Sequence, residues 1–336
     1  MTAKIIERND DIVTGLRAFL AFELGDAQHL ALSDLKRTST GFSRENWTFV
    51  AHWRDASGDH SLPLILRRDP PGSLLETDRR CEFGVLRSLH STGLPVPSTP
   101  WADIEGRWLG SPSLIMEIAP GECDWHALTG ARPLAIRLAL ANAFLALLSQ
   151  IQSVEWRGLG LGDLLGDPGP NAALRELGHW GAELRRVQLE PMPEMELVLS
   201  WLEARARPSR RTVLVHGDFK PGNALILDDR ISAMLDWETA HLGDPLEDLG
   251  WITNPARSGE HQIPGAWERT EIVAAFKHRT GYAFEDDELV WWNMFSCWKL
   301  AIIILTGARA FIDGRFDRVH HNPTWLYRRM LKMMGA

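Results

Sequence analysis

The sequence is poor in cysteine and tyrosine and carries no excess of positive charge. Its 336 residues include 3 Cys and 2 Tyr, beside 15 Trp. The cysteines, Cys81, Cys123 and Cys297, are scattered and form no CxxC pair, so neither a disulfide framework nor a thiolate zinc site is indicated. With 36 Lys and Arg against 44 Asp and Glu, a broad surface for nucleic acid is not expected, since it needs clustered basic residues.

Long hydrophobic runs are also missing. The first residues, MTAKIIERNDD, lack the apolar core of a secretory signal. The longest apolar stretch, LAIIILTGA at 300–308, is far shorter than the roughly 20 residues that cross a bilayer. We therefore expect a cytoplasmic protein with no membrane partner. At roughly 150 residues per domain, the length indicates about two domains, or one domain in two lobes.

The hydrophobic pattern changes character along the chain. Helical spacing over 10–22 is followed by strand-like runs within 34–53 and by a short apolar strand at 62–68. An amphipathic helix is predicted within 79–97, and 107–122 reads as a pair of strands. The first third is therefore expected to be a small lobe rich in β-structure.

Long helices dominate after about residue 120. The segment 134–154 is apolar almost all round, which predicts a helix in a core. Short β-like runs and polar turns interrupt the helical pattern at 212–240, and it resumes from 246. We expect an α+β chain in which residues 1–119 form the small lobe and residues 120–336 form a larger helical lobe.

The densest polar cluster is HGDFKPGN at 216–223, with Asp236 following at the end of a second apolar run. Asp and Asn oxygens are hard ligands of the kind that Mg²⁺ prefers, usually alongside substrate phosphates. One further Asp can accept the proton of an attacking hydroxyl, and a Lys can stabilise the charge of a transferring phosphate. The set is typical of metal-assisted phosphoryl transfer.

These residues carry a family resemblance. HGDFKPGN, followed by LDWE and by GDPLEDLGW at 243–251, resembles the aminoglycoside phosphotransferase-like family, relatives of protein kinases that phosphorylate small molecules. The protein-kinase pattern H-R-D-L-x-x-x-N is matched with Gly217 in place of Arg. The segments LRRDPPG, LDWE and GDPLEDLGW are most similar to those of the subgroup that includes kinase domains fused ahead of some acyl-CoA dehydrogenases. The resemblance runs from about residue 30 to 310.

The resemblance implies a bilobal protein-kinase-like fold. Its N-terminal lobe, 1–119, would be a small antiparallel sheet that binds the nucleotide. The larger helical lobe, 120–336, would carry the catalytic loop and the acceptor site. In the GDPLEDLGW segment, Asp244 suits a helix start, and Asp248 would brace the catalytic loop.

The resemblance also implies a role for each polar residue of the catalytic segment. Asp218 aligns with the base that orients and deprotonates the acceptor hydroxyl. Lys220 stands where related kinases place a contact to the γ-phosphate. Asn223 and Asp236 match the Mg²⁺ ligands of the family. His216 is expected to brace the loop by hydrogen bonding rather than to transfer protons.

In the N-terminal lobe the implied residues are more dispersed. The segment 39–46, which includes Ser43, occupies the position of the nucleotide loop, where backbone N–H groups hold phosphate oxygens. The strand position that normally carries the ATP-positioning Lys reads Leu-Arg-Arg, and Arg67 is the candidate for that role. Glu82, on the following helix, is its expected ion-pair partner.

The segment Met-Glu-Ile-Ala at 116–119 matches the hinge, where the backbone of Glu117 and Ala119 would meet adenine. The implied cofactors are ATP and Mg²⁺, and the implied reaction moves the γ-phosphate of ATP to a hydroxyl of a small molecule. No spacing rule decodes the acceptor pocket. Aminoglycoside-like, choline-like and hydroxyacyl-CoA acceptors therefore all stay open.

Two other functions compete with this interpretation. A nucleotide-binding pseudokinase, acting as a regulatory or interaction module, is suggested by Arg67 and by the single Gly of 39–46. A metal hydrolase using His216, Asp218 and Asp236 is the other alternative. The Trp residues of the C-terminal part follow helical spacing, and we expect them in the core rather than in a cation-binding box. They are Trp251, Trp291, Trp292 and Trp298.

Overall fold

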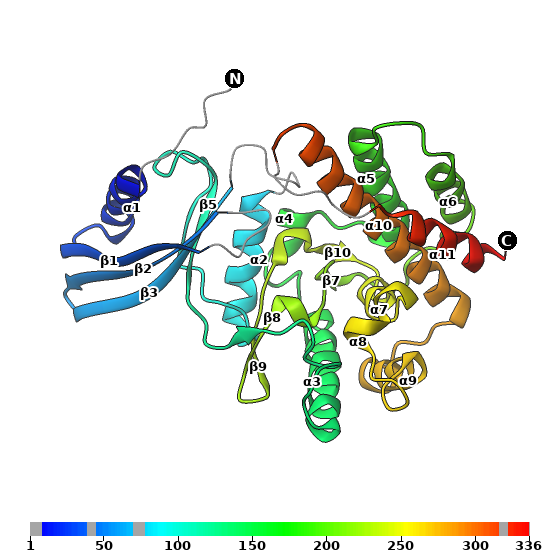
Figure 1. Ribbon diagram of the computed structural model, residues 1–336. Helices are drawn as coiled ribbons and strands as arrows, with labels where there is room; N and C mark the ends of the chain where they lie inside the picture. The colour runs from blue at the N-terminus through cyan, green and yellow to red at the C-terminus, as the bar shows by residue number, and fades with distance from the viewer. Residues whose placement is uncertain (1–8, 39–44, 70–77, 316–321, 336) are drawn as a thin grey trace. The chain divides into compact units, whose positions relative to one another are not determined.

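The computed structural model describes residues 9–38, 45–69, 78–315 and 322–335 (Figure 1). The chain divides into two compact units. The first comprises Met1–Ser91 and Pro97–Ala119, and the second comprises Thr92–Val96 and Pro120–Ala336. The predicted nucleotide-loop residue Ser43 lies outside the described residues, as do 39–44 as a whole.

The first unit is built on an antiparallel sheet, five-stranded over the described residues, in the order β1-β2-β3-β5-β4. Alternate residues of β2, Trp47, Phe49 and Ala51, are buried on one face, which is the pattern of a half-buried strand. The strands are β1 (Gln28–Thr38), β2 (Glu45–Asp55), β3 (Gly58–Arg68), β4 (Trp101–Asp103) and β5 (Ser113–Glu117).

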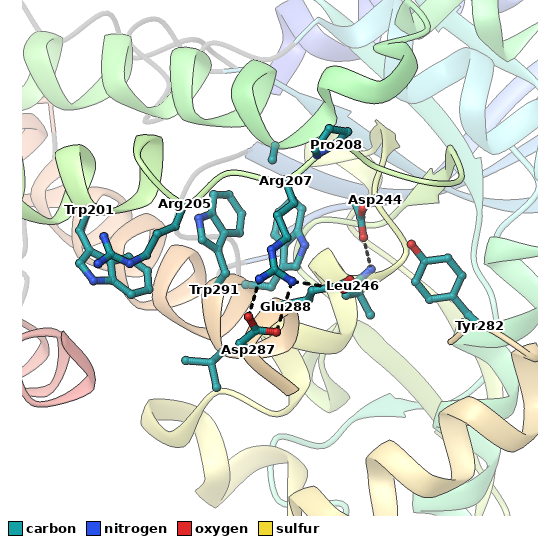
Figure 2. Close-up of a pocket in the computed structure, with 13 residues that line it drawn as sticks. Trp201, Arg205, Arg207, Pro208, Asp244, Leu246, Tyr282, Asp287, Glu288 and Trp291 are labelled. Carbon is teal, nitrogen blue, oxygen red and sulfur yellow. Dashed lines mark hydrogen bonds and ion pairs between the residues drawn. The ribbon is translucent and has the colours of Figure 1, made fainter. Parts of the chain in front are cut away.

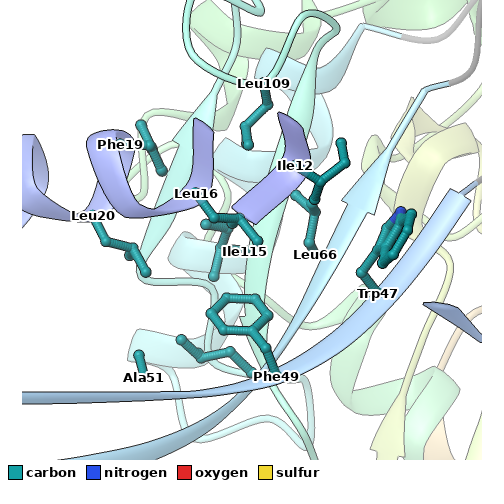
Figure 3. Packing of buried hydrophobic residues seen from close by; sticks show 11 residues of the cluster. Ile12, Leu16, Phe19, Leu20, Trp47, Phe49, Ala51, Leu66, Leu109 and Ile115 are labelled. Carbon is teal, nitrogen blue, oxygen red and sulfur yellow. The ribbon is translucent and has the colours of Figure 1, made fainter. Parts of the chain in front are cut away.

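Helix α1 (Asn9–Leu24) covers that face of the sheet (Figure 3). Its buried residues Ile12, Leu16, Phe19 and Leu20 follow the i, i+4, i+7, i+8 spacing of one helical face. They pack against Trp47, Phe49, Ala51, Leu64, Leu66, Leu109 and Ile115. The helix predicted at 10–22 and the strand predicted at 62–68 are thereby confirmed.

The prediction of a strand pair at 107–122 is wrong. Residues 107–112 form turns, and β5 pairs with β3 on one side and with the short strand β4 on the other. The cause is Asp103, whose carboxylate accepts the backbone N–H groups of Arg107, Trp108 and Leu109 at 2.8–2.9 Å. A side chain therefore satisfies the backbone donors that a strand would have paired.

The second unit is mainly helical. Among the described residues, α3 (Leu134–Gln152) and α10 (Asp286–Ile312) are long and apolar enough to cross a membrane by length and composition. Of the most apolar window, 61% is buried in α10 and 39% in α3, so α10 in particular is a core helix. The other helices are α2 (Arg79–Ser91, in the first unit), α4 (Leu161–Leu165), α5 (Ala172–Val187), α6 (Pro193–Glu203), α7 (Leu246–Ile252), α8 (Ser258–His261), α9 (Arg269–Thr280) and α11 (Thr324–Met334).

Small sheets interrupt these helices and flank the polar segment 216–223. Strand β7 (Val213–Val215) pairs with β10 (His241–Gly243). Strands β6 (Glu122–Cys123), β8 (Ala224–Leu227) and β9 (Arg230–Met234) form the other sheet. The β8–β9 turn uses Asp228 and Asp229 at positive φ, which suits a tight hairpin. The described chain is thus α+β, as predicted.

Candidate active site

The loop 216–223 connects the end of β7 to the start of β8 (Figure 1). Its polar side chains converge on Asp218. The Nζ of Lys220 lies 2.5 Å from Asp218 Oδ2. The Nδ2 of Asn223 donates to the same Oδ2 and to the main-chain oxygen of Asp218, both at 3.0 Å. Three residues that the sequence assigned to phosphoryl transfer therefore share one cluster.

Asp236 reaches the neighbourhood of this loop through the β8–β9 hairpin. The N–H of Leu235 donates to the main-chain oxygen of Asn223 at 2.7 Å, so Asn223 and Asp236 belong to adjacent stretches of backbone. Asp236 is held in the left-handed region, at φ 66°, which Asp tolerates better than most residues. Because Nδ2 of Asn223 is used by Asp218, its Oδ1 is the atom suited to a cation. Amide and carboxylate oxygens fit Mg²⁺.

His216 holds the loop from beneath. The side chain is fully buried; its Nε2 donates to the carbonyl of Leu235 at 2.9 Å, and its Nδ1 accepts the N–H of Asp218 at 3.2 Å. Burial lowers the pKa of His216, which keeps the imidazole neutral in this tautomer. The hydrogen bonds expected of a bracing His216 are present. Because backbone groups engage both ring nitrogens, a hydrolase metal on His216 would have to break these bonds.

Asp248, on α7, fixes the start of the loop. Its carboxylate accepts the N–H groups of His216 and Gly217 at 2.8 and 3.0 Å, the bracing contact expected from the sequence. Gly217 has φ 82°, and a Cβ there would lie 2.7 Å from the carbonyl oxygen of Thr239. A larger residue does not fit, which explains glycine where protein kinases carry Arg. Asp244 starts α7 as predicted, its Oδ1 accepting the N–H of Leu246.

Trp125 is a site residue that the sequence did not reveal. The Nζ of Lys220 lies 4.9 Å from the centroid of its ring. The ring also packs on Gly222, where an added Cβ would lie 2.6 Å from ring atoms. Trp125 is brought there because β6 pairs with β8, and half of the residue (50%) remains exposed. No local pattern around Trp125 signals this pairing.

The first unit pairs Arg67 with Glu82. The Nη1 of Arg67 lies 3.1 Å from Oε1 of Glu82, whose side chain is only 1% exposed. Arg68 instead uses its guanidinium on the carbonyl of Leu109, so Arg67 is the arginine directed to α2. Sequence reasoning missed Arg79, which contacts Glu82 as well.

The hinge segment lies at the end of β5. The N–H of Glu117 already donates to the main-chain oxygen of Ser98 at 2.8 Å, and its side chain accepts the Oγ of Ser98. The N–H of Glu117 is therefore already engaged within the first unit. Ala119 follows directly after this strand.

A separate cavity of about 290 Å³ lies in the second unit, at the end of α6 and the start of α10 (Figure 2). Gly243 pairs with Val213, the first residue of β7, so Asp244 in the cavity wall lies beside the start of that strand. The 216–223 loop follows the other end of β7. Aromatic and charged side chains line it, with Arg207 and Asp287 ion-paired at 2.5 Å. They include Trp201, Arg205, Tyr282, Glu288, Trp291 and Trp292.

Comparison with known sequences identifies relatives of this chain. The model of the phosphotransferase enzyme family matches residues 34–285. Acyl-CoA dehydrogenase family member 11 of Rattus norvegicus is 30% identical over 262 residues, which cover 72% of this chain and 33% of that protein. The chain spans about a third or less of the length of the curated relatives it matches.

Solved structures share the fold. A candidate aminoglycoside phosphotransferase from Ralstonia eutropha JMP134 has a TM-score of 0.71 at 22% identity, over 95% of this chain and 94% of that one. APH(2")-IIa, in a ternary complex with streptomycin and ATP, has a TM-score of 0.55 at 16% identity, over 86% and 89% of the two chains. These likenesses show the kinase-like phosphotransferase fold. Since the family model matches most of its length, this chain belongs to the phosphotransferase enzyme family.

Proposed function

We propose that this chain transfers the γ-phosphate of ATP to a hydroxyl group of a small molecule, with Mg²⁺. The observation that carries the proposal is the convergence of Lys220 and Asn223 on Asp218, beside the hairpin that ends at Asp236. Membership of the phosphotransferase family supports the reaction class. The complex of APH(2")-IIa with ATP and streptomycin supports ATP as donor and a small molecule as acceptor.

Asp218 is the proposed base. Its Oδ2 is held by Lys220 and Asn223, so we assign Oδ1 to accept the proton of the acceptor hydroxyl. The ammonium of Lys220 has three donors, of which one is on Asp218. The remaining donors suit the γ-phosphate oxygens. Such residues act by positioning the reactants and by stabilising charge.

Asn223 and Asp236 are the proposed Mg²⁺ ligands, through Oδ1 and the carboxylate. When bound there, Mg²⁺ would neutralise charge on the ATP phosphates. His216 holds the two backbone stretches together, because its ring bonds both to Asp218 N–H and to Leu235 C=O. The ligand positions therefore depend on a neutral, buried histidine.

We assign nucleotide binding to residues 1–119, and the catalytic loop and acceptor site to residues 120–336. Arg67, steadied by Glu82, would contact the phosphates in place of the usual Lys, as a planar guanidinium with several donors. The carbonyl of Glu117 and the backbone of Ala119 would meet adenine. Ser43 and its segment would contribute backbone N–H groups to the phosphates.

A panel of acceptors tests the proposal. Release of ADP from MgATP is measured with aminoglycosides, choline, sugars and hydroxyacyl-CoAs; the names of the acyl-CoA dehydrogenase relatives favour the last class. We expect one class to stimulate turnover and Asp218→Asn to lower kcat by about 10²-fold or more. The matched control is Asp228→Asn, an exposed carboxylate at positive φ on the adjoining hairpin, which should keep full activity.

Two outcomes would redirect the assignment. Wild-type turnover by Asp218→Asn with the true acceptor would remove Asp218 as the base. Binding of MgATP in a thermal-shift assay, without turnover on any acceptor, would favour the nucleotide-binding pseudokinase. Arg67 in place of Lys is the observation that keeps this second function in view.

A further inference from the structure

Lys299 places a buried ammonium against the backbone of the 216–223 loop. It lies on α10, is 2% exposed, and its Nζ donates to the carbonyl oxygen of Gly217 at 2.8 Å. The same Nζ lies 3.3 Å from Oε1 of Glu247. Burying a cation costs several kcal/mol unless it is well paired. Its position therefore needs a compensating environment, which the surrounding residues supply.

Two indole rings complete that environment. The Nζ of Lys299 lies 5.1 Å from the ring centroid of Trp180 and 5.3 Å from that of Trp251. Such distances allow cation–π attraction, which strengthens when the cation is desolvated. Trp251 is buried, as its helical spacing predicted, but the prediction of packing alone was incomplete. Its ring also contacts a cation.

Glu247 connects Lys299 to two further ionisable side chains, His241 and Glu176. The Nε2 of His241 lies 3.0 Å from Oε2 of Glu247 and 3.5 Å from Oε1 of Glu176. These three side chains also have the proximity of a metal site, with ligand atoms within 4.8 Å of one another. Glu247, however, already faces the ammonium of Lys299 on its other oxygen. The group is therefore a charge network that balances Lys299.

The contact with Gly217 is connected by hydrogen bonds to both segments that carry predicted catalytic residues, one at Asp218 and the other at Asp236. The peptide that accepts from Lys299 joins Gly217 to Asp218, and the N–H of that peptide donates to Nδ1 of His216 at 3.2 Å. The Nε2 of His216 donates in turn to the carbonyl of Leu235, the residue before Asp236. Hydrogen bonds in such a chain polarise one another.

We propose that Lys299 is a positioning residue for phosphoryl transfer, which fixes the Gly217–Asp218 peptide and thereby the carboxylate of Asp218. The proposal rests on the proposed function of Asp218 as base. Lys299 makes no contact with the reactants in this assignment and acts through the backbone. Its loss should therefore lower kcat more than it changes KM for ATP.

Hydrogen exchange followed by mass spectrometry tests the positioning without any substrate. We expect Lys299→Met to raise the exchange rate of 216–223 at least tenfold, with no such rise in the β2–β3 hairpin of the first unit. Because that variant takes the ammonium away from Oε1 of Glu247 and leaves this carboxylate only its contact with His241 among those described above, the double variant Lys299→Met/Glu247→Gln is measured beside it. Lys299→Arg keeps the charge and the donors and should restore most of the protection.

Lys277 provides the matched control. Its Nζ also donates to a backbone carbonyl, that of Phe284 at 2.9 Å, and lies 4.3 Å from the Phe284 ring. It belongs to α9 and takes no part in the chain of bonds to His216. Lys277→Met should leave the exchange of 216–223 and the rate of phosphoryl transfer unchanged.

Kinetics then separate the outcomes. With MgATP and the acceptor found in the panel, or water if none is found, we expect the Lys299 double variant to lose at least tenfold in kcat with KM for ATP within threefold. A wild type without MgATP turnover defeats the proposed function, and hydrogen exchange alone then decides whether Lys299 holds the loop. Each of four results would overturn the proposal. They are an unchanged exchange rate of 216–223, a uniform rise in exchange rate across the chain, an unchanged kcat, and a stoichiometric metal ion that is lost with Glu176→Gln.

Discussion

At the scale of single residues, ion pairs decide which charges are fixed and which can act on a ligand. Glu82 is nearly inaccessible and is shared by Arg67 and Arg79. Arg79 is more deeply buried than Arg67 and also binds Asp69, at 2.5 Å. Arg79 therefore holds the carboxylates in place, whereas Arg67, 15% exposed, keeps a face toward solvent.

Replacement of the two arginines by methionine should have opposite consequences. Arg79→Met leaves two carboxylates without their main partner, and we expect it to lower the free energy of unfolding by about 3–5 kcal/mol. Arg67→Met leaves Glu82 bound to Arg79, so the cost should stay near 1 kcal/mol, while the Kd for ATP rises about tenfold or more. Urea denaturation and calorimetric titration measure the two effects. Equal losses of stability would contradict this division of roles.

His241 gives the charge network a dependence on pH. Burial alone would lower its pKa, but the carboxylates of Glu176 and Glu247 outweigh burial and raise the pKa to about 9. The folded state thus binds the proton more tightly than the unfolded state. The stabilisation is complete below pH 6.5, the ordinary pKa, and is lost as pH rises through about 9.

The stability difference between wild type and His241→Gln should therefore shrink across that window. We expect it to fall by up to about 3 kcal/mol between pH 6.5 and 9, since one pKa unit corresponds to about 1.4 kcal/mol. Urea denaturation at half-unit steps of pH gives both curves. Parallel curves for the two proteins would show that His241 is not protonated in the folded state.

At the scale of elements, hydrophobic periodicity predicted the helices and strands that form by packing one apolar face. The helix at 10–22 and the strand at 62–68 follow from residues that are neighbours in sequence and share a face. The segment 107–112 could not be predicted in this way, because its turns depend on the carboxylate of Asp103 binding three backbone N–H groups. Alternating hydrophobicity says nothing about such a contact.

A buried carboxylate, that of Asp244, lies just before the first residue of helix α7, and its burial lowers the stability of the folded state when it is charged. Asp244 is buried, and burial raises its pKa to about 6. Its Oδ1 accepts the N–H of Leu246, an interaction that an amide oxygen can also make. For an acid with a raised pKa, the folded state binds the proton more tightly, so stability falls as pH rises from about 4 to 6 and stays lower above.

Asp244→Asn should remove that fall. We expect the variant to equal wild type in stability below pH 4 and to exceed it by up to about 3 kcal/mol at pH 7. Thermal or urea unfolding at pH 4 and pH 7 measures the change, and Asp228→Asn, on the exposed β8–β9 turn, is the control. A variant that is less stable than wild type at pH 7 would mean that the charge itself holds the helix start.

At the scale of the whole molecule, the predictable part of the site is the part that is contiguous in sequence. Asp218, Lys220 and Asn223 lie within one loop, and their cluster follows from that loop and the hairpin after it. Lys299 is 82 residues from Gly217, and its contact depends on how α10 packs in the second unit. Trp125 likewise reaches Lys220 only through strand pairing. Tertiary packing supplies these residues, and no sequence spacing reports it.

Ligand binding should link the proposed metal ligands to the stability of the whole chain. A ligand that binds only the folded state at one hundred times its Kd adds about 2.7 kcal/mol to the free energy of unfolding. We expect MgATP to give such an increase and ATP with excess EDTA to give much less. Asp236→Asn preserves the left-handed backbone at this position, because Asn tolerates it as Asp does, yet it removes the charge that would hold Mg²⁺. Its unfolding should respond equally to ATP with and without Mg²⁺. A full Mg²⁺-dependent increase in Asp236→Asn would place the cation on other residues and remove Asp236 from the proposed metal site.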